Sequence, residues 1–375
     1  MRPLPFLTLA TSLLALGSCA DSSTDHPPLP ADPGPPVDLT VRRFDEALHA
    51  LDTTVLDAEA ERALGAGAGA EGGSDNQEVP ARGTLQNLVD EYGPFADIYF
   101  THLVPIRRGD LSPSEQAAAL AAFRRYPLTH GIDSIVAARF QDGEELTPLI
   151  EDFEEALTYY HYYLPRAGVP DSLTVYYSPF ELAAFLYGDG ELAVGLDFFL
   201  GPDFDYQAVN PNEEIFSDYL TRTYTPEHFT TKLLRVLLDD YAPRPRAGRL
   251  LDYLVSEGKK LYLLRQLQPD VPAHVVFEVT PEQMEWLEGN ESEIYFYLQE
   301  EDALYTTDTQ RIRKYTQPAP TSQGMPRESP GGAVNYLGYR IVADYLENNP
   351  EVTIGQLFAE GDGQRVLAGA RFKPR

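Results

Sequence analysis

The sequence predicts an α+β fold that is mostly helical and contains one small mixed or antiparallel sheet. Segments with apolar residues three and four positions apart dominate the chain, and several of them begin with helix-capping residues. Strand-like segments are confined to the middle third, where a Gly-Asp-Gly turn at 188–190 separates two apolar runs. The chain has 375 residues, 43% of them hydrophobic, and is long enough to bury a large core.

The first 19 residues have the pattern of a bacterial lipoprotein signal peptide. Arg2 is followed by an apolar run from Leu4 to Leu16, which is too short to span a bilayer, and then by Gly17-Ser18-Cys19. Cys19 is the only cysteine of the chain and stands where such signals carry their acyl groups, palmitate among them. We therefore expect a mature protein that is attached to a membrane through Cys19 and has no disulfide.

Two low-complexity stretches lie near the start of the expected globular domain, which covers residues 39–375. Residues 20–38 contain six prolines among Ser, Thr and Asp, and we expect an extended tether that reaches up to roughly 50 Å in polyproline form. Residues 65–77 are rich in Gly and Ala and are expected to form a flexible insertion. Their glycines match a dinucleotide-binding pattern formally, but no strand precedes them and no helix starts directly after them.

Helices are predicted on both sides of the middle third. The first is expected from Val41 through Leu51, and the stretch from 84 to 164 has helical periodicity, with a capping box at Ser112-Pro113-Ser114-Glu115. Lys259-Lys260, in a later helix, is interpreted as part of a solvated face. Further helices are predicted to start at Thr147-Pro148, to follow Thr225-Pro226-Glu227 as far as Tyr241, and to run from about Leu250 to Gln266.

The strands of the sheet are predicted in the middle third. Residues 173–177 are rich in residues that favour strands, and the apolar runs 182–187 and 192–200 flank Gly188-Asp189-Gly190. A two-strand hairpin is therefore expected across this turn.

The C-terminal part is expected to contain two long helices. Thr280, Pro281 and Gln283 predict a capped helix that runs to about Gln299. After the turn at Ser329-Pro330-Gly331, a second helix is predicted with one buried stripe, formed by Val334, Leu337, Ile341 and Tyr345. Gly338 interrupts this helix at a cost of roughly 1 kcal/mol relative to alanine, which predicts the close approach of another element.

The charge balance excludes one class of partner. The chain has 58 acidic and 29 basic residues, a formal net charge of -29. Polyanion binding requires clustered basic side chains, so nucleic acid is not expected as a partner. We interpret the acidic excess as a solvated surface.

The sequence contains no recognisable catalytic set. None of the seven histidines is four residues from another, whereas a zinc peptidase of the zincin type needs two histidines one helical turn apart. On the helix where such a pair is expected, His228 is followed by Phe229, and Lys232 occupies the next turn. A nucleophile elbow, a phosphate loop and a catalytic cysteine are equally absent from the sequence. We therefore expect no catalytic residue, no metal and no cofactor.

A series of short signatures in the second half of the chain resembles the GldB family, gliding-motility lipoproteins of Bacteroidota. The similarity extends over residues 39–375 and departs from the family pattern at 65–77 and at Gly332, where an arginine is expected. The signatures are Gly195-Leu196-Asp197 with Leu200-Gly201, Gly258 to Tyr262, Val279 to Gln283, Asn290-Glu291, Leu304 to Asp308, Ser329-Pro330-Gly331 and Tyr336 to Tyr345.

The resemblance implies a zincin-like architecture without the zinc motif. It also implies a non-enzymatic, lipid-anchored component of the gliding apparatus, or of the type IX secretion machinery coupled to it, with other envelope proteins as partners. The expected location is the cell envelope, with the periplasmic face and the cell surface both open. The alternative is an envelope hydrolase with a zincin-like fold and non-standard active-site residues.

The resemblance also singles out Asn290, Glu291 and the turn Ser329-Pro330-Gly331 as a structural or partner-binding site. We expect Asn290 and Glu291 to pair with backbone groups of this turn and so to hold its shape. Direct contact with a partner protein is the alternative for these residues.

Overall fold

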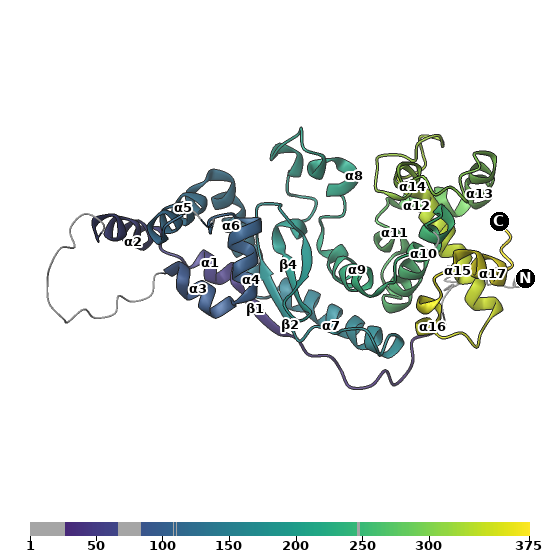
Figure 1. The fold of residues 1–375 in the computed structure, drawn as a ribbon, viewed down its shortest axis with the longest axis horizontal. Helices are drawn as coiled ribbons and strands as arrows, with labels where there is room; N and C mark the ends of the chain where they lie inside the picture. Colours follow the sequence, from purple (N-terminus) through teal and green to yellow (C-terminus); the bar gives the residue numbers. More distant parts are fainter. Residues whose placement is uncertain (1–26, 67–83, 108, 110, 246–247) are drawn as a thin grey trace, which may run out of the picture.

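The computed structural model describes residues 27–66, 84–107, 109, 111–245 and 248–375. The predicted signal peptide with Cys19, the start of the tether and residues 67–77 of the predicted insertion lie outside these residues. In the described part, a helical N-terminal region, a small sheet and a helical C-terminal region follow one another along the long axis of the molecule (Figure 1). The predicted α+β class is confirmed.

One four-stranded mixed sheet lies in the middle of the molecule. Its strands are β1 (Thr40–Arg43), β2 (Ser172–Tyr176), β3 (Ala184–Tyr187) and β4 (Glu191–Gly195), in the spatial order β1-β2-β4-β3. β1, β2 and β4 are parallel, and β3 pairs with β4 as the predicted antiparallel hairpin. All residues of β2 are buried, as expected for a parallel strand covered on both faces.

The start of the first predicted helix is wrong. Residues Thr40–Arg43 form the edge strand β1, and the helix α1 begins only at Phe44 and ends at His49. Val41 aligns with Leu173 of β2, and the backbone N–H of Thr40 donates to Asp171 O at 3.0 Å. In so short a segment the spacing of apolar residues does not indicate helix or strand reliably. Hydrogen bonding to the distant strand β2 determines its structure.

The N-terminal region is helical, as predicted. Ser112 and Glu115 form the predicted capping box. Phe95 covers one face of the sheet, with its ring centroid 6.1 Å from Phe185 and 5.6 Å from Tyr187. The helices are α2 (Thr53–Ala66), α3 (Thr84–Tyr92), α4 (Pro94–Ile98) with the π-helical turn Tyr99–Leu103, α5 (Pro113–Arg125), α6 (Pro127–Phe140) and α7 (Leu146–Tyr163).

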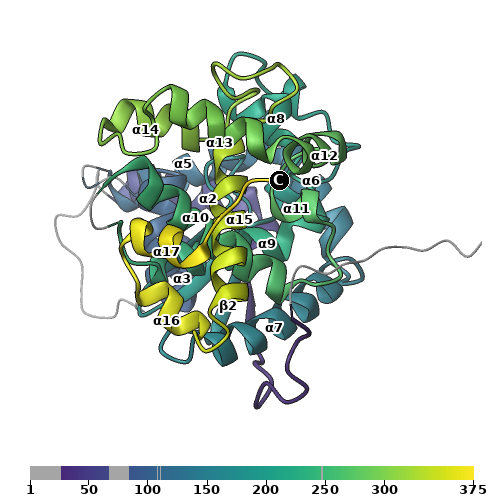
Figure 2. The same cartoon turned by 90° about the vertical axis from the view of Figure 1, so that its right-hand side faces the viewer.

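The C-terminal region is built around α10 and α15, which lie side by side at its centre (Figure 2). The predicted continuous helix from Pro281 to Gln299 is wrong, because it breaks at Asn290, whose φ of -125° and ψ of 24° lie outside the helical region. The helices are α8 (Asp218–Thr221), α9 (Phe229–Tyr241), α10 (Leu250–Leu267), α11 (Ala273–Val276), α12 (Pro281–Gly289), α13 (Glu291–Glu300), α14 (Thr309–Thr316), α15 (Ala333–Asn348), α16 (Ile354–Ala359) and α17 (Gly363–Ala370).

Two glycines allow the backbones of α10 and α15 to touch. A Cβ atom on Gly338 would lie 1.9 Å from Leu254 O, and one on Gly258 would lie 2.2 Å from the carbonyl carbon of Gly338. The close approach predicted from Gly338 is therefore confirmed. At the start of α15, Gly332 has a φ of +72°, a left-handed conformation that favours glycine over the arginine expected there.

The described part of the predicted tether contacts the domain. The N–H of Val37 donates to Thr158 Oγ1 at 2.9 Å, that of Leu39 donates to Glu154 Oε1 at 2.7 Å, and Pro27 O accepts from Gln266 Nε2 at 2.8 Å. The segment thus follows α7 as far as the C-terminal end of α10. No helix in the described part of the chain is apolar and long enough to cross a membrane.

A buried carboxylate organises the loop between β2 and β3. Asp197 is fully buried, and its Oδ2 accepts the backbone N–H groups of Ser178 at 3.3 Å and Phe180 at 2.5 Å. Phe180 has a φ of +68°, so these bonds hold a strained backbone in place. Burial raises the pKa of Asp197 to about 7, although the two N–H groups oppose this rise.

We expect Asp197 to make the protein less stable as the pH rises from about 4 to 7. In the unfolded chain an aspartate titrates near pH 4. In this window the folded state therefore binds a proton that the unfolded state has released. The stabilisation that comes from this proton is complete below about pH 4 and is lost as the pH approaches 7. The free energies of unfolding of the Asp197→Asn variant and the wild type should diverge across this window by about 1 kcal/mol per pH unit. Urea unfolding at a series of pH values measures this divergence.

The control for this experiment is Asp203→Asn, because Asp203 is exposed. The Asp203→Asn variant should follow the wild type at every pH. Parallel curves for Asp197→Asn and the wild type would show that folding does not raise the pKa of Asp197.

Candidate functional site

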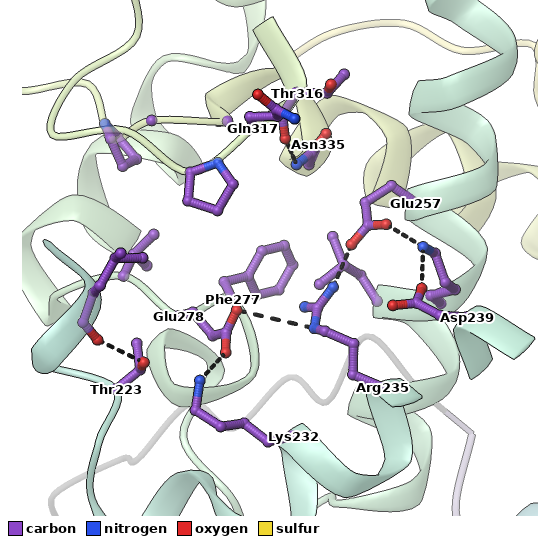
Figure 3. Close-up of a pocket in the computed structure, with 18 of the residues that line it drawn as sticks. Thr223, Lys232, Arg235, Asp239, Glu257, Phe277, Glu278, Thr316, Gln317 and Asn335 are labelled. Carbon is purple, nitrogen blue, oxygen red and sulfur yellow. Dashed lines mark hydrogen bonds and ion pairs between the residues drawn. The ribbon is translucent and has the colours of Figure 1, made fainter. Parts of the chain in front are cut away.

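A cleft of about 750 Å³ lies between the sheet edge and the C-terminal helices, a volume typical of ligand sites. Its walls come from α9 and α10, from residues 277–279 directly after α11, from residues 182–184 at the β3 edge, and from the loop 316–319 with the turn 330–333. Figure 3 shows Phe277 between the charged residues of α9 and the polar residues of this loop. Segments far apart in the sequence therefore form one cavity.

A continuous network of ion pairs crosses one wall of the cleft (Figure 3). Glu278 lies 3.0 Å from Lys232 Nζ and 3.9 Å from Arg235 Nε, and Arg235 also pairs with Glu257. Lys260 Nζ lies 2.6 Å from Glu257. Asp239, at 2.7 Å from Lys260 Nζ, ends the network.

The network keeps Glu278 and Glu257 charged at neutral pH. Burial alone would raise the pKa of Glu278, but Lys232 and Arg235 lower it to about 2. Burial also opposes the ionised form of Glu257, yet Arg235 and Lys260 hold its pKa below the usual value. These carboxylates are therefore weak bases that cannot readily take up a proton.

The interpretation of Lys259 and Lys260 as a solvated face is wrong. Lys259 is 6% exposed, and its ammonium donates to the backbone oxygen of Glu360 at the end of α16. Burial lowers the pKa of Lys259 to about 8. Lys260 lies in the ion-pair network, where Glu257 and Asp239 raise its pKa despite burial. Helix packing and long-range pairing, which one helix alone does not reveal, bury both residues.

Arg222 differs from the other buried cations of the cleft. Its Nη1 donates to Gln283 Oε1 at 2.9 Å and its Nη2 to the backbone oxygen of Glu278 at 3.1 Å. Both acceptors are neutral, and the buried Nε has no hydrogen-bond partner within the described residues. Burial lowers the pKa of Arg222, and the Glu278 charge opposes this effect.

The opposite wall carries an unpaired acceptor. Asn335 Nδ2 donates to Thr316 O at 3.1 Å, whereas the buried Oδ1 has no partner in the described part of the chain. The predicted turn also borders the cleft through Pro330 and Gly331. Gly331 packs so closely on the neighbouring loop that a Cβ atom would lie 2.2 Å from Ala319 O.

His228 and Lys232 lie where the sequence places the zincin positions. His228 is 6% exposed, and its Nδ1 lies 2.8 Å from Thr225 Oγ1. Burial, assisted by the Lys232 charge, lowers the pKa of His228 to about 4, so the imidazole is neutral. One turn later the Lys232 ammonium pairs with Glu278. Among the described residues, no three His, Cys, Asp or Glu side chains are placed to share a metal ion.

The predicted site residues separate into two places. Ser329, Pro330 and Gly331 are held by Ser322, whose N–H donates to Ser329 O at 3.3 Å and whose Oγ donates to Pro330 O at 2.6 Å. Ser329 itself is buried, and its Oγ donates to Pro326 O at 2.8 Å. The turn is thus held by its own loop.

The expected pairing of Asn290 and Glu291 with the turn is wrong. Asn290 Nδ2 donates to Trp286 O at 2.7 Å, which closes the end of α12. Glu291 is buried and lies 3.1 Å from Arg340 Nε of α15, and it also accepts the N–H of Arg375 at 3.2 Å. The break at Asn290 turns Glu291 toward α15.

The ion-paired cleft was not predicted from the sequence. The paired residues are far apart in the chain; Lys232 and Glu278 are separated by 46 positions. The available signal was the spacing of Lys232, Arg235 and Asp239 along one face of α9, with Glu257 and Lys260 similarly spaced on α10. Charges that repeat at helical spacing on two otherwise apolar helices are compatible with an ion-paired cleft as well as with a solvated face.

Fold and site together define a helical α+β protein with an ion-paired cleft. The family model described as gliding motility protein GldB matches residues 76–374, and the chain therefore belongs to the GldB family of gliding-motility lipoproteins. The family expected from the sequence signatures is confirmed. No curated protein and no solved structure matches the chain, so the expected zincin-like architecture is not confirmed.

Proposed function

We propose that this chain is a lipid-anchored, non-catalytic component of the gliding apparatus, or of the type IX secretion machinery coupled to it, and that it acts by binding another envelope protein. Family membership and the lipoprotein-type N-terminus support the location. The observation that carries the binding role is the cleft, which combines about 750 Å³ of open volume with unpaired polar atoms on opposite walls.

The chemistry of the cleft favours binding over hydrolysis. A general base works best with a pKa near the working pH, whereas the pKa of Glu278 is lowered to about 2 by its cationic neighbours. The neutral His228 is buried against Thr225, and Lys232 directs its charge at Glu278. Glu278 therefore stays ionised and His228 stays neutral near pH 7, so neither is suited to exchange protons.

The docked N-terminal segment supports a particular orientation on the membrane. With Pro27 attached to Gln266, only residues 20–26 separate the domain from Cys19. Seven residues span roughly 20 Å when extended, less than half of the reach of the whole predicted tether. The end of the domain where α7 and α10 terminate would therefore face the membrane closely.

We expect both the anchor and the cleft to be needed for motility. Cys19→Ser should release a folded protein from the membrane fraction and abolish colony spreading, because the acyl chains provide the attachment.

Leu182→Glu should leave the protein folded and membrane-bound but abolish spreading, since Leu182 lines the cleft and is 40% exposed. Spreading assays, membrane fractionation and thermal unfolding of each variant test these expectations.

Val55→Glu is the matched control, because Val55 is 42% exposed on α2, far from the cleft. This variant should spread like the wild type. If Cys19→Ser stays in the membrane fraction after a high-salt wash, the anchor is wrong. If Leu182→Glu spreads normally, the binding role of the cleft is wrong.

A further inference from the structure

We propose that the cleft binds an extended peptide segment of a partner protein that carries a carboxylate, and that Arg222 is the residue that recognises this carboxylate. The inference rests on the proposed function, because it specifies the ligand of the same cleft. Its basis is the charge of the cleft and the unpaired atoms at Arg222 and Asn335.

The cleft is positively charged in a strongly acidic protein. Five cationic side chains line it against three carboxylates, a formal excess of two positive charges, whereas the whole chain has a net charge of -29. The cations are Arg222, Lys232, Arg235, Arg244 and Lys260, and the carboxylates are Asp239, Glu257 and Glu278. An anionic ligand is therefore attracted to this part of the surface.

Arg222 has free donors for such an anion. A guanidinium has five N–H donors, and two are used by Gln283 and the Glu278 backbone. Nε–H is among the remaining three; it is covered by neighbouring protein atoms and has no hydrogen-bond partner within the described residues, so the Arg222 side chain has to turn toward the cleft before this N–H can reach a ligand. Nε–H and one neighbouring terminal N–H form the fork that binds a carboxylate with two parallel hydrogen bonds. Arg235 Nε also has no hydrogen-bond partner among the described residues, but the charge of Arg235 is already neutralised by Glu257 and Glu278. Carboxylates likewise neutralise Lys232 and Lys260.

The acceptor on the opposite wall favours a peptide over a simple anion. Asn335 Oδ1 is buried without a partner among the described residues and needs an N–H donor. A peptide supplies backbone N–H donors together with a carboxylate, whereas an ionised fatty acid lacks the donor. Phe277 and Tyr336 also line the cleft with aromatic rings, which suit an apolar side chain of the same peptide.

The cavity continues past Arg222. Arg222 and Tyr219 also line a second cavity of about 870 Å³, which is bordered by residues 202–207. Arg222 thus lines both cavities. An extended chain could therefore continue past the recognised carboxylate, which suits a carboxylate from a side chain as well as one from a C-terminus.

The test uses the full chain purified in detergent and four forms of one short acetylated peptide, Ala-Pro-Phe-Ala-X. X is Glu or Gln, and each peptide is made as the free acid and as the C-terminal amide. Binding is followed by isothermal titration and by the fluorescence of Trp286, the only tryptophan, on the helix that provides Gln283. We expect peptides with a carboxylate to bind at least about tenfold more tightly than the Gln amide. The Gln free acid carries only a C-terminal carboxylate and the Glu amide only a side-chain carboxylate, so comparing their affinities shows which of the two is recognised.

Variants test the assignment to Arg222. Arg222→Gln should abolish the preference for carboxylates, Arg222→Lys should restore part of it, and Arg244→Gln, the same charge change at the exposed rim, should retain it. Should Arg222→Gln fail to fold, Leu182→Glu and Leu182→Gln replace it, and only the glutamate should weaken carboxylate binding.

Equal affinity for all four peptides, or an unchanged preference in Arg222→Gln, would overturn the inference. No binding of any peptide by the folded wild type would overturn it as well. The proposed function would still stand in each case if Leu182→Glu abolishes spreading, so the two failures are distinguishable.

Discussion

Glu291→Ala is expected to lower the free energy of unfolding by about 3–5 kcal/mol, the usual cost of removing one partner of a buried ion pair. The Glu291 and Arg340 side chains are 3% and 5% exposed, and their atoms lie 3.1 Å apart. Without Glu291, Arg340 retains Asp344 at 3.6 Å but loses its closest carboxylate. The N–H of Arg375, which Glu291 also accepts, would lose this acceptor. Denaturant unfolding monitored by circular dichroism measures the change.

Glu293→Ala is the matched control, because Glu293 is exposed in the first turn of the same helix. It should change the free energy of unfolding by less than about 0.5 kcal/mol. Asn290→Ala should cost about 1 kcal/mol, since it removes one hydrogen bond at the end of α12. If Glu291→Ala is as stable as Glu293→Ala but abolishes spreading, Glu291 contacts a partner and the structural role is wrong.

Local signals in the sequence predicted most helix starts correctly. The capping boxes at Ser112 and Thr280 depend on residues three positions apart, so a single sequence contains the whole interaction. The same holds for the hairpin around Gly188-Asp189-Gly190, because its turn and its strands are adjacent. The pair Gly289-Asn290 is also a local helix-ending signal, and the predicted helix to Gln299 passed over it.

Long-range pairing explains what the sequence did not reveal. β1 is a strand because β2, more than a hundred residues later, provides its hydrogen bonds. Glu291 matches a family signature, but its partner Arg340 lies 49 residues further on. Arg222 belongs to none of the signatures, and only the fold brings it to Gln283, Glu278 and the cleft. A single sequence does not show whether a charged side chain faces water or lines a cleft.

Gly338 is the case in which a local anomaly correctly indicated a tertiary contact. A glycine inside an apolar helix is unfavourable by itself, so its presence pointed to another backbone nearby. The structure contains that backbone: Leu254 of α10 is so near that a Cβ atom would lie 1.9 Å from its carbonyl oxygen. The clash involves main-chain atoms of two long helices, which no side-chain rotation can relieve.

We therefore expect Gly338→Ala to lower the free energy of unfolding by about 3 kcal/mol or more, since overpacking in a core costs about 1–3 kcal/mol even where side chains can shift. Gly131→Ala, in the interior of α6, is the matched control, because a Cβ atom there meets nothing within 4 Å. It should stabilise the protein by about 0.5–1 kcal/mol through helix propensity and the unfolded state. Opposite signs for the same substitution in two helices would show that the contact of α10 with α15, not helix propensity, requires Gly338. Equal stabilisation by both variants would mean that α10 and α15 are further apart in solution, and that the cleft wall built on α10 is not fixed in the shape described.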